Sequence, residues 1–199
     1  MNESFKVGDK LVKRRKQHGM RNFILFVLIC VVVAVSGKVV VNRLFPVDYT
    51  RYINQSAAEY GLDRYLVMGI IKAESNFNPR AISGSNAKGL MQLTDATAAE
   101  CSRKMGIKNF QPDDIFDPKT NIRMGCFYLS YLLERFDGEE ETALAAYNAG
   151  EGNVQKWLQD SRYSQDGKTL SKIPFAETEN YNQKIRVYRS IYERMDQKK

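Results

Sequence analysis

The feature that most constrains this chain is an uncharged apolar stretch near its N-terminus. Phe23 to Val35 is an unbroken apolar run, and Val39–Val41 extend it after a short interruption. Residues 23–41 number about 19, close to the roughly 20 apolar residues that a helix needs to cross a lipid bilayer. The stretch lacks the polar face of a helix on the surface of a soluble domain. It therefore predicts an N-terminal transmembrane helix.

The charges on either side of this stretch predict its orientation. Of the net charge of +7, residues 1–22 hold +5, from seven basic and two acidic side chains, and residues 23–37 hold none. Because positive residues stay on the cytoplasmic side, we expect a cytoplasmic tail at 1–22 and the rest of the chain outside, in a single-pass protein of the cell membrane. A cleaved signal peptide is the alternative, since Ala34–Ser36 resembles a cleavage site. The rest of the chain carries a net charge of only +2, and a nearly balanced domain is not typical of a protein that binds nucleic acid.

The part of the chain beyond the membrane predicts one mainly helical domain. Residues 42–46 form a tether, and residues 47–199 are enough for one core. Apolar spacing, capping residues and breakers predict a set of helices, at 48–60, 64–77, 95–105, 118–136, 142–147, 154–158 and 176–195. Three segments rich in polar residues are expected as loops or breaks, at 78–93, 148–153 and 160–173. The first of these predicts a small β element.

The cysteines and the single histidine do not predict a metal site. Cys101 and Cys126 lie in the outer domain, where a disulfide persists, and two buried free thiols are the alternative. His18 lies in the basic tail, and no pattern has metal-ligand spacing. We therefore expect neither metal nor cofactor.

The helix over 64–77 predicts a carboxyl group with a raised pKa. Leu66, Val67, Ile70 and Ile71 form its apolar face, and Glu74 occupies the next position on that face. Burial disfavours the charged form of Glu74, and so does the partial negative charge at the C-terminal end of a helix. A glutamic acid that stays protonated near neutral pH is suited to general acid catalysis. A solvent-exposed or lysine-paired Glu74 is the alternative.

Four short strings, in order and in register, resemble the catalytic domain of the soluble-type lytic transglycosylases. These strings are Glu74-Ser75, Gly89–Gln92 (Gly-Leu-Met-Gln), Ala146–Gly150 (Ala-Tyr-Asn-Ala-Gly) and Ile173–Thr178 (Ile-Pro-Phe-Ala-Glu-Thr). Ser83 lies nine residues beyond Glu74, as in that family. The similarity covers about residues 47–195. It implies a lysozyme-like α+β fold, in which a helical bundle surrounds a long buried helix and a small β element lies beside the cleft.

The resemblance also implies the reaction. The family cleaves the β-1,4 bond between N-acetylmuramic acid and N-acetylglucosamine in peptidoglycan without water. The muramic C6 hydroxyl attacks C1 and leaves a 1,6-anhydro end. On this pattern Glu74 protonates the leaving oxygen and then, as a carboxylate, takes the proton from the C6 hydroxyl.

Further site residues follow from the same resemblance, and each has a physical rationale. We expect the substrate-binding residues to be Ser75, Ser83, Gly89, Met91, Gln92, Tyr147, Asn148 and Glu177. The hydroxyl of Ser83 would hold the N-acetyl group, and the missing side chain of Gly89 would let the sugar approach the backbone. Tyr147 and Asn148 offer a phenol and an amide. Glu177 either lies in the cleft or caps the last helix.

Two other functions remain open on the sequence alone. A goose-type lysozyme would hydrolyse the same bond and needs a second carboxylate, for which Glu177 and the aspartates within 113–117 are candidates. A non-catalytic wall-binding component of a secretion or conjugation complex is the third reading, although such a module has no need of a buried acid. In each reading the partners are peptidoglycan strands and the cytoplasmic membrane.

Overall fold

The computed structural model describes residues 26–27, 39–41 and 43–197. The chain divides into two compact units, Met1–Pro46 and Val47–Lys199. The predicted cytoplasmic tail and most of the predicted membrane-spanning stretch lie outside the described residues. Within the described part of the chain, no helix has the length and apolar character needed to cross a bilayer.

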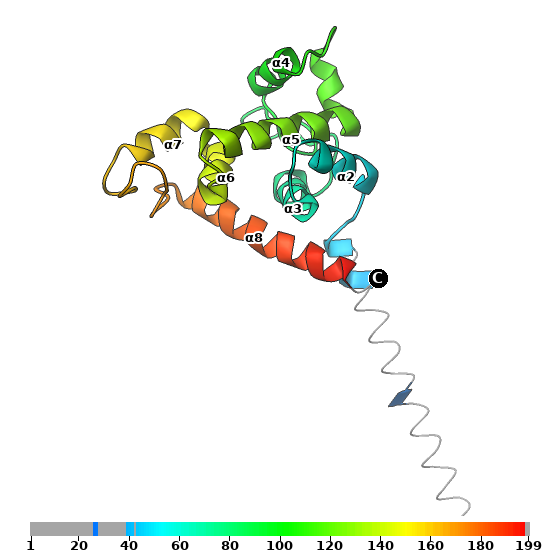
Figure 1. Ribbon diagram of the computed structural model, residues 1–199. Helices are drawn as coiled ribbons and strands as arrows, with labels where there is room; N and C mark the ends of the chain where they lie inside the picture. The colour runs from blue at the N-terminus through cyan, green and yellow to red at the C-terminus, as the bar shows by residue number, and fades with distance from the viewer. Residues whose placement is uncertain (1–25, 28–38, 42, 198–199) are drawn as a thin grey trace, which may run out of the picture. The chain divides into compact units, whose positions relative to one another are not determined.

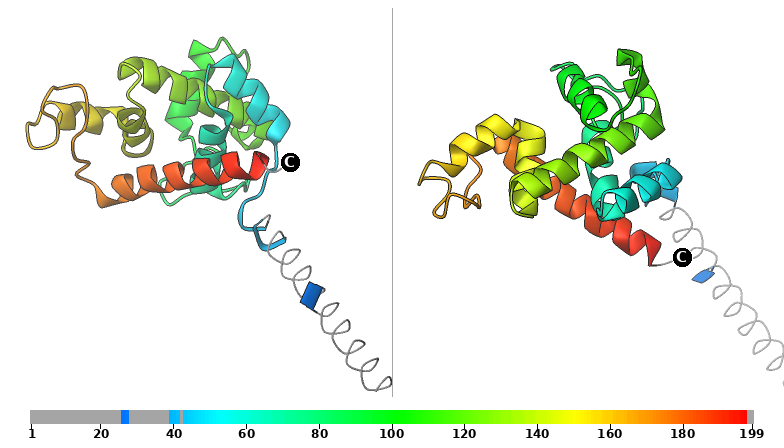
Figure 2. Two further views of the ribbon diagram at one scale, coloured as in Figure 1. Left: turned by 60° about the horizontal axis from the view of Figure 1, so that its bottom comes forward. Right: turned by 45° about the horizontal axis from the view of Figure 1, so that its top comes forward.

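The described residues of the second unit form seven α-helices and one 3-10 helix, η1 (Figure 1). In chain order these are α2 (Thr50–Glu59), α3 (Arg64–Ser75), α4 (Asp95–Lys104), η1 (Pro112–Phe116), α5 (Pro118–Arg135), α6 (Glu140–Ala149), α7 (Glu151–Leu158) and α8 (Ala176–Asp196). The mainly helical fold predicted from the sequence is confirmed. Figures 1 and 2 show α4 and η1 near one end of α5, and α6 and α7 near its other end.

Capping residues begin three of these helices where the sequence predicts them. The side chain of Asp63 accepts a hydrogen bond from the backbone of Tyr65 at the start of α3. Thr94 caps α4 in the same manner. Asp117 accepts from the backbone of Thr120 at the start of α5, and Pro118 occupies the first helical position.

The helix α3, which carries Glu74 in its last turn, packs closely against α8. The apolar face predicted for α3 is buried: Leu66, Val67, Ile70 and Ile71 have at most 2% exposed surface. A side chain at Gly69 would lie 3.2 Å from the backbone oxygen of Ile185 in α8. This glycine lets the two helix backbones approach closely, and α3 lies between α5 and α8 (Figure 1).

Two helix boundaries differ from the prediction. We expected Asn78-Pro79 to end the Glu74 helix, but α3 ends at Ser75 because Asn76 adopts the left-handed conformation (φ 51°). We also expected a Gly/Asn break over 148–153. Only Gly150 (φ 88°) separates α6 from α7, since α6 continues to Ala149 and the acidic Glu151 begins α7. A carboxylate in a first helical turn is favoured by the helix dipole.

The 3-10 helix η1 was missed in the sequence. Its signal is a reciprocal cap: the backbone of Gln111 donates to the side chain of Asp114, and Pro112 follows directly. The aspartates at 114 and 117 therefore cap helices.

The predicted β element is reduced to two isolated antiparallel bridges among the described residues. Ile82 pairs with Lys88, and Lys88 pairs with Leu93. They fold residues 78–93 into a compact loop. Cys101 and Cys126 are buried free thiols, so the disulfide alternative is not realised.

Candidate active site

Glu74 lies in the last turn of α3 and receives a hydrogen bond from α8. The phenol of Tyr181 donates to its Oε1 atom over 2.6 Å. Burial raises the pKa of the Glu74 carboxyl to about 7, and the hydrogen bond from Tyr181 offsets part of this rise. The alternative of a lysine-paired Glu74 is not realised by Lys72, which donates to Asn76 and lies 5.9 Å from the ring of Tyr188. A group with a pKa near 7 can serve as acid and as base at neutral pH.

A second phenol, Tyr147 of α6, lies close enough to Glu74 for the charge of Glu74 to affect the pKa of the phenol. Burial raises the pKa of Tyr147 well above its usual value, and the charge of Glu74 adds to the effect. Its hydroxyl donates to the backbone oxygen of Met91 over 2.8 Å. Tyr147 therefore stays neutral and links α6 to the loop at 78–93.

Asn121 of α5 holds that loop in place and was not predicted. It is fully buried. Its Oδ1 atom accepts from the amide of Met91 over 2.8 Å, and its Nδ2 atom donates to the backbone oxygens of Lys88 (3.1 Å) and Ile115 (2.9 Å). One side chain thus satisfies three backbone groups and fixes the loop to the junction of η1 and α5.

The structure gives Gly89 and Met91 roles in packing. A side chain on Gly89 (φ 78°) would lie 2.2 Å from Nδ2 of Asn121, so the glycine is needed for packing against α5. The side chain of Met91 is fully buried and would collide with any side chain at Gly125. It belongs to the core, and no part of it is exposed for an apolar contact with substrate.

Ser75, Ser83 and Gln92 have hydrogen-bond partners within the domain. Ser75 donates to the backbone oxygen of Leu90 over 2.8 Å, which joins the end of α3 to the loop. Gln92 donates to the backbone oxygens of Ala81 and Gly89. Ser83, which is partly exposed, accepts from the amide of Ala87 and shares a hydrogen bond with Ser85.

The two C-terminal strings meet through a single hydrogen bond. Thr178 of α8 donates to Oδ1 of Asn148 in α6 over 2.8 Å. Glu177 lies next to Thr178 in the first turn of α8, and its side chain is exposed. Because the side chain of Thr178 is buried and that of Glu177 is exposed, the two neighbours point to different faces of α8.

Sequence reasoning missed three residues that build this site. Tyr181 belongs to the buried face of α8, Asn121 to a mostly apolar stretch of α5, and Thr178 to the last of the four strings. A polar group on the buried face of a helix needs a hydrogen-bond partner, so its presence there indicates a contact with another element. Its partner could not be named, because 107 residues separate Tyr181 from Glu74.

The helical fold, and the carboxyl with a raised pKa at the end of the helix α3, are those of a lysozyme-like domain. The chain belongs to the transglycosylase SLT domain family, whose model matches residues 51–170.

Relatives and solved structures agree with this membership. The chain is 33% identical over 150 residues to the "Soluble lytic murein transglycosylase" of Salmonella typhimurium, covering 74% of this chain and 23% of the relative. It is 40% identical over 115 residues to the "Membrane-bound lytic murein transglycosylase C" of Yersinia enterocolitica, covering 53% and 32%. The match thus spans about a quarter to a third of these relatives' lengths.

Among solved structures, the chain is similar to an inactive mutant of the lytic transglycosylase Slt from Pseudomonas aeruginosa. The two share 37% identity with a TM-score of 0.67, over 76% of this chain and 25% of that one. The complex of a 70-kDa soluble lytic transglycosylase with bulgecin A gives 29% identity and a TM-score of 0.69, over 81% and 27%.

Proposed function

We propose that this protein is a lytic transglycosylase of peptidoglycan. It cleaves the β-1,4 bond between N-acetylmuramic acid and N-acetylglucosamine and leaves a 1,6-anhydromuramic end. The observation that carries the proposal is the carboxyl of Glu74, whose pKa is raised to about 7 by burial. The names of the relatives, lytic murein transglycosylases, support the same reaction.

Glu74 acts twice in the proposed reaction. Its protonated form donates to the glycosidic oxygen as that bond breaks, and the resulting carboxylate takes the proton from the muramic C6 hydroxyl as that oxygen bonds to C1. The proton count closes without water, and Glu74 ends protonated. Tyr181 donates to the carboxylate that exists between the two steps, so it keeps the pKa from rising further.

The surroundings of Glu74 favour this route over hydrolysis. Hydrolysis by inversion needs a second carboxylate to activate water, and hydrolysis by retention needs one as nucleophile. Of the candidates for that role, Asp114 and Asp117 are engaged as helix caps, and Asp113 and Glu177 are exposed.

The remaining site residues divide into two proposed groups. The sugar contacts come from side chains that are at least partly exposed, namely Ser83, Gln92, Tyr147, Asn148 and Glu177. The frame of the site comes from Ser75, Gly89 and Met91, which fix the loop at 78–93 against α3 and α5.

We further propose that residues 23–41 anchor the protein in the cytoplasmic membrane, with the domain outside. The uncharged stretch and the basic residues before it support this placement. Detection of the full-length size in the membrane fraction, by immunoblot against the domain, tests it. A shortened, released form would identify the stretch as a signal peptide.

Product mass tests the reaction. Sacculi digested with the full chain in mild detergent are expected to yield muropeptides one water lighter than those from a lysozyme. The Glu74→Gln variant serves as the background control. Products with reducing muramic ends would contradict the transglycosylase assignment, and unchanged digestion by Glu74→Gln would contradict the role of Glu74.

A further inference from the structure

One side of α8 is open to solvent and mixes apolar with basic side chains, although the helix already has a buried side. Tyr181, Ile185 and Tyr192 belong to the buried side, and α8 packs against α3 and α6. A second set of residues recurs every three or four positions, so its members lie together on another side of the helix. We call this set the α8 stripe, and its members are Lys184, Val187, Tyr188, Ile191, Arg194 and Met195.

The apolar members of the α8 stripe are exposed to a degree that the rest of the helix does not explain. Val187 is 56% exposed, and Tyr188, Ile191 and Met195 are partly exposed. Figure 1 shows α8 along one edge of the domain, with α3 and α6 on the same side of it. Adjacent exposed apolar side chains on a protein surface mark a site of contact with a partner or a membrane.

The charged members of the α8 stripe are both positive. Lys184 and Arg194 are exposed, and neither forms an ion pair or a side-chain hydrogen bond with another described residue. Arg186 and Arg189, on other sides of the helix, are paired with acidic residues of α6 and of the turn before α3. In this described part of α8, no acidic residue lies on the side of the stripe between Lys184 and Met195. The stripe therefore presents uncompensated positive charge.

The chain itself brings this side of α8 near a bilayer. This step rests on the membrane anchor proposed above for residues 23–41. Residues 42–46 span at most about 17 Å when extended, so Val47, which begins the domain, stays within that distance of the anchor. Burial raises the pKa of Tyr192 in α8, and the nearby charges of Tyr188 and Asp48 add to the rise. The start of the domain and the C-terminal half of α8 are therefore neighbours.

A lipid surface matches both chemical features of the α8 stripe. Basic side chains are attracted to anionic headgroups, and apolar side chains enter the boundary between headgroups and acyl chains. The ring and hydroxyl of Tyr188 suit the same boundary. A second copy of this chain fits less well, because a symmetric contact would bring the positive charges of two stripes together.

We propose that the α8 stripe docks on the anionic phospholipid surface of the membrane that anchors the chain. Docking holds the domain in one orientation, with α8 nearer to the bilayer than α3, which carries Glu74. The proposed sugar contact Glu177 precedes Lys184 by seven residues, or about 10 Å along the helix axis. The stripe thus begins beyond the sugar contacts, and docking leaves the site open to glycan.

Energy transfer from α8 to labelled lipid tests the docking. The full chain is reconstituted in vesicles of phosphatidylcholine, with or without phosphatidylglycerol, and carries a donor dye on Gln183→Cys, at the exposed edge of the stripe. Cys101 and Cys126 are buried, and the chain without the added cysteine gives the labelling background. Transfer to an acceptor on the headgroups is expected to be stronger with phosphatidylglycerol and to weaken when salt is added.

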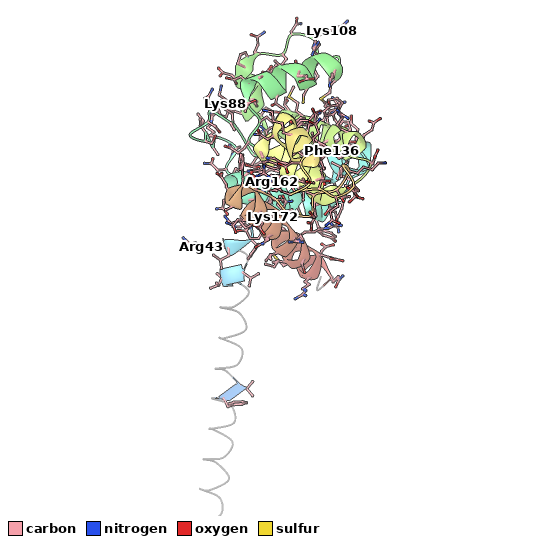
Figure 3. The ribbon with its side chains drawn as sticks, turned by 90° about the vertical axis from the view of Figure 1, so that its left-hand side faces the viewer. Arg43, Lys88, Lys108, Phe136, Arg162 and Lys172 are labelled. Carbon is pink, nitrogen blue, oxygen red and sulfur yellow. The ribbon has the colours of Figure 1, made fainter. Side chains whose placement is uncertain are left out.

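Matched charge variants locate the docking surface. Lys184→Gln/Arg194→Gln is expected to lower the ratio of docked to undocked domain about 25-fold, since each basic residue near an anionic surface contributes about fivefold. Val187→Asn is expected to lower it about fivefold through lost apolar burial. The control Arg103→Gln/Lys108→Gln removes the same charge from α4 and the segment after it, and should keep the wild-type ratio. Figure 3 shows Lys108 at the opposite end of the domain from α8.

The outcomes separate the docking from the anchor and from the proposed reaction. Equal transfer in both lipid compositions, or an equal loss in the Lys184/Arg194 variant and its control, would overturn the docking. Transfer that follows protein density instead of phosphatidylglycerol would identify a second copy as the occupant and overturn it too. A chain that does not float with the vesicles would overturn the anchor and the docking together. Digestion of sacculi in detergent by the Lys184/Arg194 variant should match the wild type, so a failure of the proposed reaction is detected independently.

Discussion

Glu74 and Glu177 are two carboxylates near the ends of helices, and their surroundings are opposite. Glu74 lies in the last turn of α3, is largely enclosed and has a pKa raised to about 7. Glu177 lies in the first turn of α8, where the helix dipole favours a negative charge, and is exposed. The phenol that reaches Glu74 belongs to Tyr181, one turn after Glu177. The comparison teaches that packing between the helices, rather than the carboxyl group itself, makes Glu74 suitable as an acid.

Exchange of each carboxyl for an amide is expected to give the largest difference between them. Glu74→Gln should lower the rate of sacculus digestion about 1,000-fold, because positioned acid–base groups contribute about 10²- to 10⁴-fold. Glu177→Gln should lower it less than about tenfold, as for a lost exposed contact. The release of soluble muropeptides measures both rates. Similar losses in the two variants would break the comparison.

Two asparagines, one buried and one exposed, extend the comparison to stability. Asn121→Ala should lower the free energy of unfolding by about 3 kcal/mol, because it leaves buried backbone groups of Met91 and Ile115 unpaired. The matched variant Asn180→Ala, at an exposed position of α8, should change it by less than about 0.5 kcal/mol. Urea unfolding followed by the fluorescence of Trp157 measures both. A small effect of Asn121→Ala would mean that the loop is held by other contacts.

The raised pKa of Glu74 predicts a pH-dependent cost in stability. The pKa rises from 4.5 to about 7 on folding, so the folded chain binds more protons than the unfolded chain between these values. The wild type therefore loses stability as the pH rises through this window, whereas Gln does not titrate. Relative to the wild type, Glu74→Gln should gain about 3 kcal/mol between pH 4 and pH 8. Urea unfolding at both values measures the gain, and an equal difference at the two pH values would contradict the raised pKa.

The smallest expected effect is a shift in the pH–rate profile, which should differ between loss of the Tyr181 hydroxyl and loss of the Thr178 hydroxyl of α8. Tyr181→Phe removes the hydrogen bond that favours the carboxylate of Glu74, so the pKa of Glu74 should rise by about one unit. The protonated acid then persists to higher pH, and the alkaline limb of the pH–rate profile should move upward. Thr178→Val removes a hydroxyl that donates to Asn148 instead, and should leave that limb in place. A shift in both variants would indicate a general loosening of α8.

Much of the fold could be predicted from local sequence. Asp63, Thr94 and Asp117 begin their helices as expected, because a cap depends on residues two or three positions away. The apolar face of α3 and the raised pKa of Glu74 followed from helical spacing and burial. The ends were less accurate: Asn76 in its left-handed conformation, rather than the proline two residues after Phe77, ends α3.

The sequence by itself determined which residue we propose as the acid and which helix carries it, since the apolar face of that helix depends on neighbours within a turn or two. Only the tertiary structure decided that Tyr181 donates to Glu74, that Asn121 holds the loop, and that Gly89 is needed for packing. These contacts join residues 30 to 107 positions apart, and spacing along the chain says nothing about such pairs. Burial at the end of its own helix raises the pKa of Glu74, and the hydrogen bond from the distant Tyr181 lowers part of that rise.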